Sequence, residues 1–251
     1  SPQIWAWKES RINAIKRDID HLHVILPFEK KYYKNKHSLE VHYSGHPLVN
    51  YINKFKSDND FFKKNNIDEN QPIIALLPGS RLQEINKVLP VFLSIVSIFK
   101  SYQFVIGGVE SVGKEKYDKL IKNKNVKVIF NQTYNLLANA NAAIVTSGTA
   151  SLEAAIFRVP QIVCYKTSFI TYFIGKMLIN IKYISLVNLI LNNNVVDELV
   201  QGGLNSNTLQ KSINRVLEED SKSEMIKSYN HLISMLYSEN PSRKTAELII
   251  E

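Results

Sequence analysis

Short apolar runs separated by turn residues recur along the middle of the chain and predict buried β-strands. The clearest run, Ile73 to Leu77, is followed directly by Pro-Gly-Ser-Arg, which is typical of a strand buried on both faces before a tight turn. We expect strands at residues 73–77, 103–106, 126–130, 142–146 and 161–165.

Helical periodicity fills the intervals between these runs. After the first run, apolar residues recur at spacings of one, three and four positions, which places them on one face of a helix. These residues are Ile85, Val88, Leu89, Phe92, Val96 and Phe99. Further helices are expected at residues 114–124, 134–140 and 149–157. Because strands and helices alternate, the pattern predicts an α/β fold with a doubly wound parallel sheet.

The two ends of the chain follow a different pattern. We interpret residues 1–48 as the tail of an amino-terminal domain, residues 49–204 as a Rossmann-like nucleotide-binding domain, and residues 205–251 as helices that pack back toward the first domain. Within the end segments we expect a strand at residues 23–26 and helices at residues 8–17, 209–217, 225–236 and 241–250. The chain opens at Ser1 without a methionine or an apolar signal segment, so we expect that its amino-terminal part is missing.

Composition restricts the class of protein and its partners. Of 251 residues, 45% are hydrophobic, and Gly and Pro number only 9 and 8, which excludes a collagen-like or broadly disordered chain. A single cysteine, Cys164, can form neither an internal disulfide nor a thiolate zinc cluster, and it indicates a reducing compartment such as the cytosol. The formal net charge of +8 favours anionic partners, namely phosphates, nucleic acid or an acidic membrane surface.

The first candidate site is the turn after the strand at residues 73–77. Gly79 lets the backbone approach a ligand closely, and Ser80 is expected to cap the next helix, with Gln83 completing a capping box. Free amides at the start of that helix favour an anion, and Arg81 adds a planar charged group suited to phosphate. The alternative is an ordinary turn with a solvated arginine.

The second candidate site follows the strand at residues 142–146. The sequence Ser147-Gly148-Thr149-Ala150 consists of small residues that leave room for a ligand at the start of a helix. One turn further on, the carboxylate of Glu153 is suited to accept hydrogen bonds from sugar hydroxyls. The alternative is a tightly packed helix start in which the glutamate stabilises the helix dipole.

Other patterns resemble known sites less closely. Gly108, Gly113 and Lys114 match most of a P-loop, but Glu115 stands where that motif needs Ser or Thr for magnesium. A metal site at residues 18–23 is disfavoured because its Asp and His side chains alternate faces where a helix meets a strand. The chain contains no G-x-G-x-x-G motif, which argues against a dinucleotide dehydrogenase.

The segment from Phe169 to Leu191 is mostly apolar, but lysines and asparagines interrupt it, so we do not expect it to span a membrane. Its first part, Phe169 to Leu178, is either a helix of the core or an interfacial contact flanked by lysines.

Several motifs taken together resemble those of one enzyme family. In chain order they are Ser1-Pro2-Gln3-Ile4-Trp5-Ala6-Trp7, Leu26-Pro27-Phe28-Glu29, Gly45-His46-Pro47, Leu77-Pro78-Gly79-Ser80-Arg81 with Glu84, Ser147-Gly148-Thr149-Ala150 with Glu153, Ser185-Leu186-Val187-Asn188-Leu189 and Glu198-Leu199-Val200-Gln201. From residue 1 to about residue 201, the chain resembles lipid-A-disaccharide synthase. The family pattern places proline at the position of Val187, a departure that leaves Asn188 in register.

The resemblance implies a GT-B type glycosyltransferase of two Rossmann-like domains, of which this chain holds the donor-binding half. The family transfers 2,3-diacylglucosamine from UDP-2,3-diacylglucosamine to lipid X, which gives the β(1→6) lipid A disaccharide 1-phosphate and UDP. We therefore predict a UDP site formed by Gly79, Ser80, Arg81, Glu84, Ser147, Gly148, Thr149, Glu153, Asn188, Glu198 and Gln201. Arg81 would stabilise the leaving group. The general base would lie upstream of Ser1, so that this chain alone would only bind the donor.

The resemblance also implies metal-independent chemistry without a cofactor, at the cytoplasmic face of the bacterial inner membrane. The expected partners are the two lipid substrates and an anionic membrane surface, without nucleic acid, and a homodimer is compatible with this interpretation. Two other functions stay open at this point. A UDP-sugar 2-epimerase shares the architecture and ligand, and a nucleotide-binding module without chemistry fits a chain that lacks the base.

Overall fold

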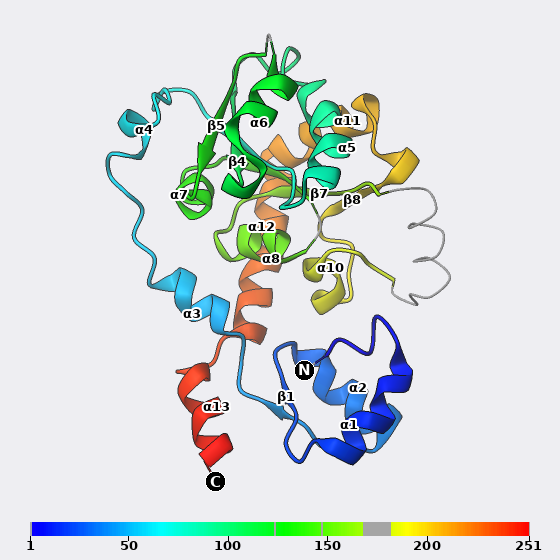
Figure 1. Ribbon diagram of the computed structural model, residues 1–251. Coiled ribbons are helices and arrows are strands. Elements are labelled where there is room, and N and C mark those ends of the chain that lie inside the picture. Colours follow the sequence, from blue (N-terminus) through cyan, green and yellow to red (C-terminus); the bar gives the residue numbers. More distant parts are fainter. Residues whose placement is uncertain (1, 123, 147, 168–181, 251) are drawn as a thin grey trace. The chain divides into compact units, whose positions relative to one another are not determined.

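The computed structural model describes residues 2–122, 124–146, 148–167 and 182–250, and the chain forms two compact units (Figure 1). The first unit comprises Ser1–Lys54, Ser168–Lys182 and Asn230–Glu251, and the second comprises Phe55–Thr167 and Tyr183–Tyr229. The predicted domain limits at residues 48 and 204 stay a prediction.

A parallel sheet of six strands forms the centre of the second unit. Its strands are β3 (Ile73–Leu77), β4 (Gln103–Gly108), β5 (Val126–Phe130), β6 (Ala142–Thr146), β7 (Gln161–Tyr165) and β8 (Asp197–Val200). They lie in the order β5-β4-β3-β6-β7-β8, so the chain runs outward from β3 in one direction and then returns to β6 to run outward in the other. Every residue of β3 and β6 is buried, which explains their continuous apolar sequences.

Helices lie before, between and after these strands in the chain, and the last of them continues into the first unit. They are α4 (Phe61–Lys64), α5 (Leu82–Leu93), η2 (Glu110–Val112), α6 (Lys114–Ile121), α7 (Thr133–Ala138), α8 (Thr149–Ile156), α10 (Leu186–Leu191), η3 (Gln201–Gly203), α11 (Ser206–Leu217) and α12 (Glu219–Leu236). Helix α5 packs beside α6 and α11, whereas α8 packs beside α10. Parallel crossovers are right-handed, so the helices between strands added in one direction lie on one face of the sheet, and those between strands added in the other direction lie on the opposite face. Since the direction reverses at β3, the group of α5 and the group of α8 lie on opposite faces of the sheet. The predicted doubly wound α/β fold is confirmed.

The first unit is smaller and has its own core. Its elements are η1 (Glu9–Arg11), α1 (Ile12–Asp18), β1 (His23–Val24), α2 (Pro27–His37), β2 (His42–Tyr43), α3 (Pro47–Asn53) and α13 (Pro241–Ile250). Strands β1 and β2 form a short parallel pair, and the buried core includes Ile4, Ile15, Val24 and Tyr33.

Two of the sequence motifs in the first unit have a structural explanation. The carboxylate of Glu29, which is 1% exposed, accepts hydrogen bonds from the Leu26 amide at 2.9 Å and from the Trp5 indole Nε1 at 3.0 Å. Gly45 has φ +96°, and a Cβ there would lie 2.4 Å from the Cβ of Ser238. Glu29 therefore holds the backbone at Leu26 through a hydrogen bond, and Gly45 is required where the chain passes close to Ser238.

Several predicted helix and strand limits are wrong, among them the strand predicted at 103–106, which extends to Gly108, and the helix predicted at 225–236, which begins at Glu219. The helix after β3 ends at Leu93 instead of Phe99, where the Ser94 hydroxyl donates back to the Val91 carbonyl at 2.7 Å. The strand at residue 23 ends at Val24 because Pro27 opens an unpredicted helix, α2. The helix after residue 114 ends at Ile121.

Within the described residues, no helix is both long enough and apolar enough to cross a bilayer.

Candidate functional site

The second unit carries a hollow at the carboxyl-terminal edge of its sheet. The hollow has a volume of about 430 Å³, and its lining includes residues from the ends of β3, β4 and β6 and from the turns that follow β3 and β6. The order of the strands reverses between β3 and β6. Open α/β sheets bind ligands in the crevice at such a reversal. The topology of the sheet therefore predicts a ligand site at this edge.

The turn between β3 and α5 forms one wall of the hollow. Gly79 has φ +101°, and a Cβ on it would lie 2.7 Å from Oε2 of Glu84. The side chain of Arg81 is 81% exposed, and its Nη1 lies 3.5 Å from Oε1 of Glu84. An exposed ion pair of this length contributes little to stability. The guanidinium is therefore available to a ligand in the hollow.

The expected cap of this turn is wrong. Helix α5 begins at Leu82, and its cap residue is Arg81 in an extended conformation, with no side chain bonded to the first amides. Ser80 thus lies one residue too early to cap the helix with Gln83. Since no side chain caps these amides with a hydrogen bond, they are suited to bind an anionic ligand.

The turn between β6 and α8 forms another part of the lining. Gly148 adopts φ +126° with no atom within 4 Å of its Cβ position, so its conformation, and not crowding, is what favours glycine there. Thr149, Ala150 and Glu153 line the hollow behind it. The predicted site residue Ser147 lies outside the described residues.

The Glu153 carboxylate is held by a residue that sequence reasoning missed. The hydroxyl of Tyr134, in α7, donates to Oε1 of Glu153 at 2.9 Å. Burial raises the pKa of Glu153, and the hydrogen bond from Tyr134 partly opposes that rise. The two residues are 19 positions apart, and no local spacing signals the contact.

Asn188 and Glu198 form a separate cluster with each other. The side chain of Asn188 is fully buried, and its Oδ1 accepts from the amides of Val195 and Val196 at 2.8 and 2.9 Å. Its Nδ2 donates to the Val196 carbonyl and to Oε1 of Glu198, both at 2.9 Å. The Glu198 carboxylate also accepts from the amides of Ile184 and Ser185. This network joins α10 to β8.

Gln201 follows β8 at the same edge of the sheet as the hollow. Its backbone has φ +50°, and its side-chain Oε1 accepts from the Thr167 amide at 2.9 Å. Among the described residues that line the hollow, neither Gln201 nor the Asn188–Glu198 pair occurs. The structure therefore brings Gly79, Ser80, Arg81, Glu84, Gly148, Thr149 and Glu153 together at the hollow. A role for the other three in UDP binding stays a prediction.

The described part of the chain contains no group of three or more His, Cys, Asp or Glu side chains arranged to hold a metal ion. In the segment that resembles a P-loop, Nζ of Lys114 forms an ion pair of 2.7 Å with Asp118 in α6.

Comparison with known proteins adds evidence independent of this geometry. A family described as lipid-A-disaccharide synthetase matches residues 1–250. The curated lipid-A-disaccharide synthase of Coxiella burnetii (strain CbuG_Q212) is 35% identical over 254 residues, which cover 99% of this chain and 67% of that relative. The chain thus spans about two-thirds of the length of this relative.

Solved structures show the same fold at low sequence identity. A glycosyltransferase from Rickettsia africae ESF-5 has a TM-score of 0.59 and 14% identity, covering 94% of this chain and 66% of that one. The UDP-GlcNAc 2-epimerase of Neisseria meningitidis, solved with UDP-GlcNAc bound, has a TM-score of 0.55 and 15% identity, covering 97% and 60%. Both transferases and epimerases therefore share this architecture.

Proposed function

Since this chain belongs to the lipid-A-disaccharide synthetase family, we propose that its hollow binds the UDP moiety of a UDP-2,3-diacylglucosamine donor. In the reaction that we propose, the diacylglucosamine passes to lipid X, giving the lipid A disaccharide 1-phosphate and UDP. The observation that supports this most strongly is the position of the exposed Arg81 guanidinium at the topological switch point of the sheet.

The geometry suits a reaction in which UDP departs. As the glycosidic bond to the donor breaks, negative charge grows on the β-phosphate. Arg81 and the uncapped amides of α5 provide fixed positive charge beside the hollow, where it would stabilise that developing charge. None of the described residues is assigned the role of general base.

Glu153 lines the hollow from α8, whereas Arg81 lines it from the turn before α5. We propose that its carboxylate accepts hydrogen bonds from the ribose hydroxyls, so that the nucleoside lies toward α8 and the pyrophosphate toward α5. This orientation can be tested with pyrophosphate, which lacks the nucleoside and would therefore contact the α5 side of the hollow but not Glu153.

The replacement Glu153→Gln tests this orientation. Hydrogen bonds to a charged acceptor contribute about 1 kcal/mol more than those to a neutral one, so UDP should bind about fivefold more weakly. Inorganic pyrophosphate should bind the variant and the wild type equally. Isothermal titration calorimetry with both ligands measures the difference. Equal losses for UDP and pyrophosphate would instead place Glu153 beside the phosphates.

An epimerase remains the main alternative because the Neisseria enzyme has the same fold. Likeness at 15% identity supports a shared architecture and does not extend to the reaction. The family match favours glycosyl transfer. Conversion of UDP-N-acetylglucosamine without any acylated acceptor would reverse this choice.

We also propose that the enzyme works at an anionic membrane surface on the cytoplasmic side. Its diacylated substrates reside in a bilayer, and the net charge of +8 favours anionic lipids. The apolar segment Phe169–Leu178, in which we expect an interfacial contact or a core helix, lies outside the described residues.

A further inference from the structure

Tyr134 connects the hollow to the segment with which the second unit begins. It lies in α7, between β5 and β6, and its hydroxyl reaches Glu153 in α8 at 2.9 Å. Both residues are partly buried, so the hydrogen bond is sheltered from bulk water. The position of the Tyr134 ring therefore decides where one oxygen of the Glu153 carboxylate lies.

Two phenylalanines fix that ring. The centroid of Tyr134 lies 5.6 Å from that of Phe55 and 5.3 Å from that of Phe157, with the ring planes at 89° and 61°. The two phenylalanine rings lie 5.8 Å from each other. Edge-to-face contacts at these distances are favourable and directional. Phe55 is the first residue of the second unit, so the point where the chain enters this unit takes part in the cluster.

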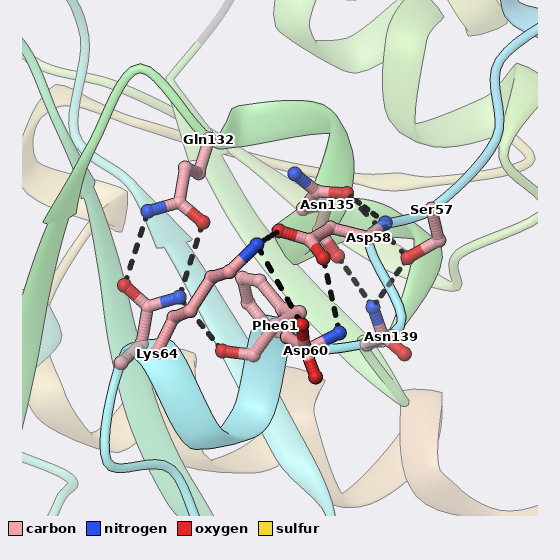
Figure 2. A network of polar contacts seen from close by, with 9 residues as sticks. Ser57, Asp58, Asp60, Phe61, Lys64, Gln132, Asn135 and Asn139 are labelled. Carbon is pink, nitrogen blue, oxygen red and sulfur yellow. Dashed lines mark hydrogen bonds and ion pairs between the residues drawn. The ribbon is translucent and has the colours of Figure 1, made fainter.

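The residues that follow Phe55 are hydrogen-bonded to α7, the helix that carries Tyr134, as Figure 2 shows. Oδ1 of Asn135 accepts from the Asp58 amide at 2.8 Å, and Nδ2 of Asn139 donates to the Ser57 hydroxyl at 3.1 Å. The ion pair of Lys64 with Asp58 at 2.6 Å, also drawn in Figure 2, braces the segment itself.

A further contact holds the other end of α7. Beyond α4, the side-chain amides of Asn65 and Gln132 donate to each other at 3.0 and 3.1 Å. Gln132 precedes the first residue of α7, and Asn139 follows its last. Residues 55–65 thus form a clamp that fixes the helix carrying Tyr134, and we call this segment the entry clamp.

We propose that Tyr134 is a positioning residue of the donor site, placed by the entry clamp so that it orients the Glu153 carboxylate toward the hydroxyls of a bound nucleoside. The proposal rests on the proposed function of the hollow as a UDP site. It adds that the segment through which the chain enters this unit controls affinity for the nucleoside part of the ligand.

The same hydrogen bond sets how binding depends on pH. Burial raises the pKa of Glu153, and a protonated carboxyl is a poorer acceptor for sugar hydroxyls, so UDP affinity falls on acidification. The Tyr134 hydroxyl stabilises the charged form, and its removal moves that fall to higher pH. The charged groups that share the hollow are Arg81 and Glu84, and α10, which packs on α8, carries no titratable side chain.

The replacement Tyr134→Phe tests this role because it removes the hydroxyl and keeps the ring in its cluster. UDP affinity of the 251-residue chain is measured by calorimetry at pH 6 and at pH 8.5, with pyrophosphate as the second ligand. We expect UDP binding to weaken at pH 6 by no more than the roughly fivefold of Glu153→Gln, and much less at pH 8.5. Pyrophosphate binding stays equal to that of the wild type at each pH.

Tyr102→Phe is the matched control, because Tyr102 lies just before β4 at the opposite edge of the sheet, and it should bind both ligands as the wild type does. Asn135→Ala tests the clamp, and it should shift the pH profile of UDP binding in the same direction by a smaller amount.

Three results would contradict these expectations in different ways. A Tyr134→Phe profile identical to the wild type, while Arg81→Ala still weakens UDP, overturns the inference and leaves the proposed function intact. A wild-type profile for Asn135→Ala removes the entry clamp from the inference. If the wild-type chain binds no UDP, the proposed function fails and the inference fails with it.

Discussion

Replacing Arg81 with alanine is expected to weaken UDP binding by about 10- to 150-fold, which corresponds to about 1.5 to 3 kcal/mol for hydrogen bonds to a charged group. The guanidinium is 81% exposed and weakly paired with Glu84, so it can bind a phosphate without giving up a strong interaction within the protein. For the same reason, the variant should unfold at nearly the same urea concentration as the wild type. Calorimetric titration with UDP measures the affinity.

Arg215→Ala is a matched control for this change, since the Arg215 side chain is 50% exposed and pairs with Asp197, the first residue of β8, at the opposite edge of the sheet from the hollow. It should leave UDP affinity unchanged. Arg81→Lys should recover only part of the affinity because an ammonium group lacks the planar pair of donors. Unchanged UDP binding in Arg81→Ala would remove this residue from the site.

Replacing Asn188 with alanine is expected to lower the free energy of unfolding by about 3 kcal/mol or more. The change leaves two backbone amides and one carbonyl without their side-chain partner in a buried place, and it removes one of the two donors to Oε1 of Glu198. Each buried polar group left unpaired costs about 1 to 3 kcal/mol, although water entering the space left by the side chain recovers part of this. Urea unfolding followed by far-ultraviolet circular dichroism measures the loss.

The control for this variant is Asn207→Ala, an exposed position in α11 where the expected change is below about 0.5 kcal/mol. This measurement also separates two roles for Asn188. A variant as stable as the wild type that has lost UDP affinity would show a ligand contact, as the family resemblance implies. A destabilised variant whose folded fraction still binds UDP would show a structural role.

Four strands of the sheet were predictable from sequence because each is a short, mostly apolar run. Residues 73–77, 126–130, 142–146 and 161–165 are strands with the predicted limits, and glycine, proline or asparagine lies close to every end except the one at Tyr165. Strand β8 and helix α10 gave no such signal. β8 lies at the edge of the sheet, is only partly buried and contains Asp197 and Glu198, so its sequence does not read as an apolar run.

The candidate site was predictable only where a local turn creates it. The turns after β3 and β6 carry Gly79, Arg81 and Gly148, and the helix that follows the second turn carries Glu153; their proposed roles follow from backbone freedom and charge. The hydrogen bond of Tyr134 with Glu153 arises from the tertiary contact between α7 and α8, which no local pattern encodes. The cap at Arg81 was mispredicted because the turn is one residue longer than the capping-box pattern assumes.

The central claim is that UDP binds at the carboxyl-terminal edge of the sheet in the second unit. Amide chemical-shift mapping by nuclear magnetic resonance, during titration of the 251-residue chain with UDP, tests it most directly. The account predicts that the largest shifts fall on Gly79, Ser80, Arg81, Gly148 and Thr149. Largest shifts at the opposite edge, around the basic hollow lined by Lys100, Tyr102 and Lys124, would contradict it.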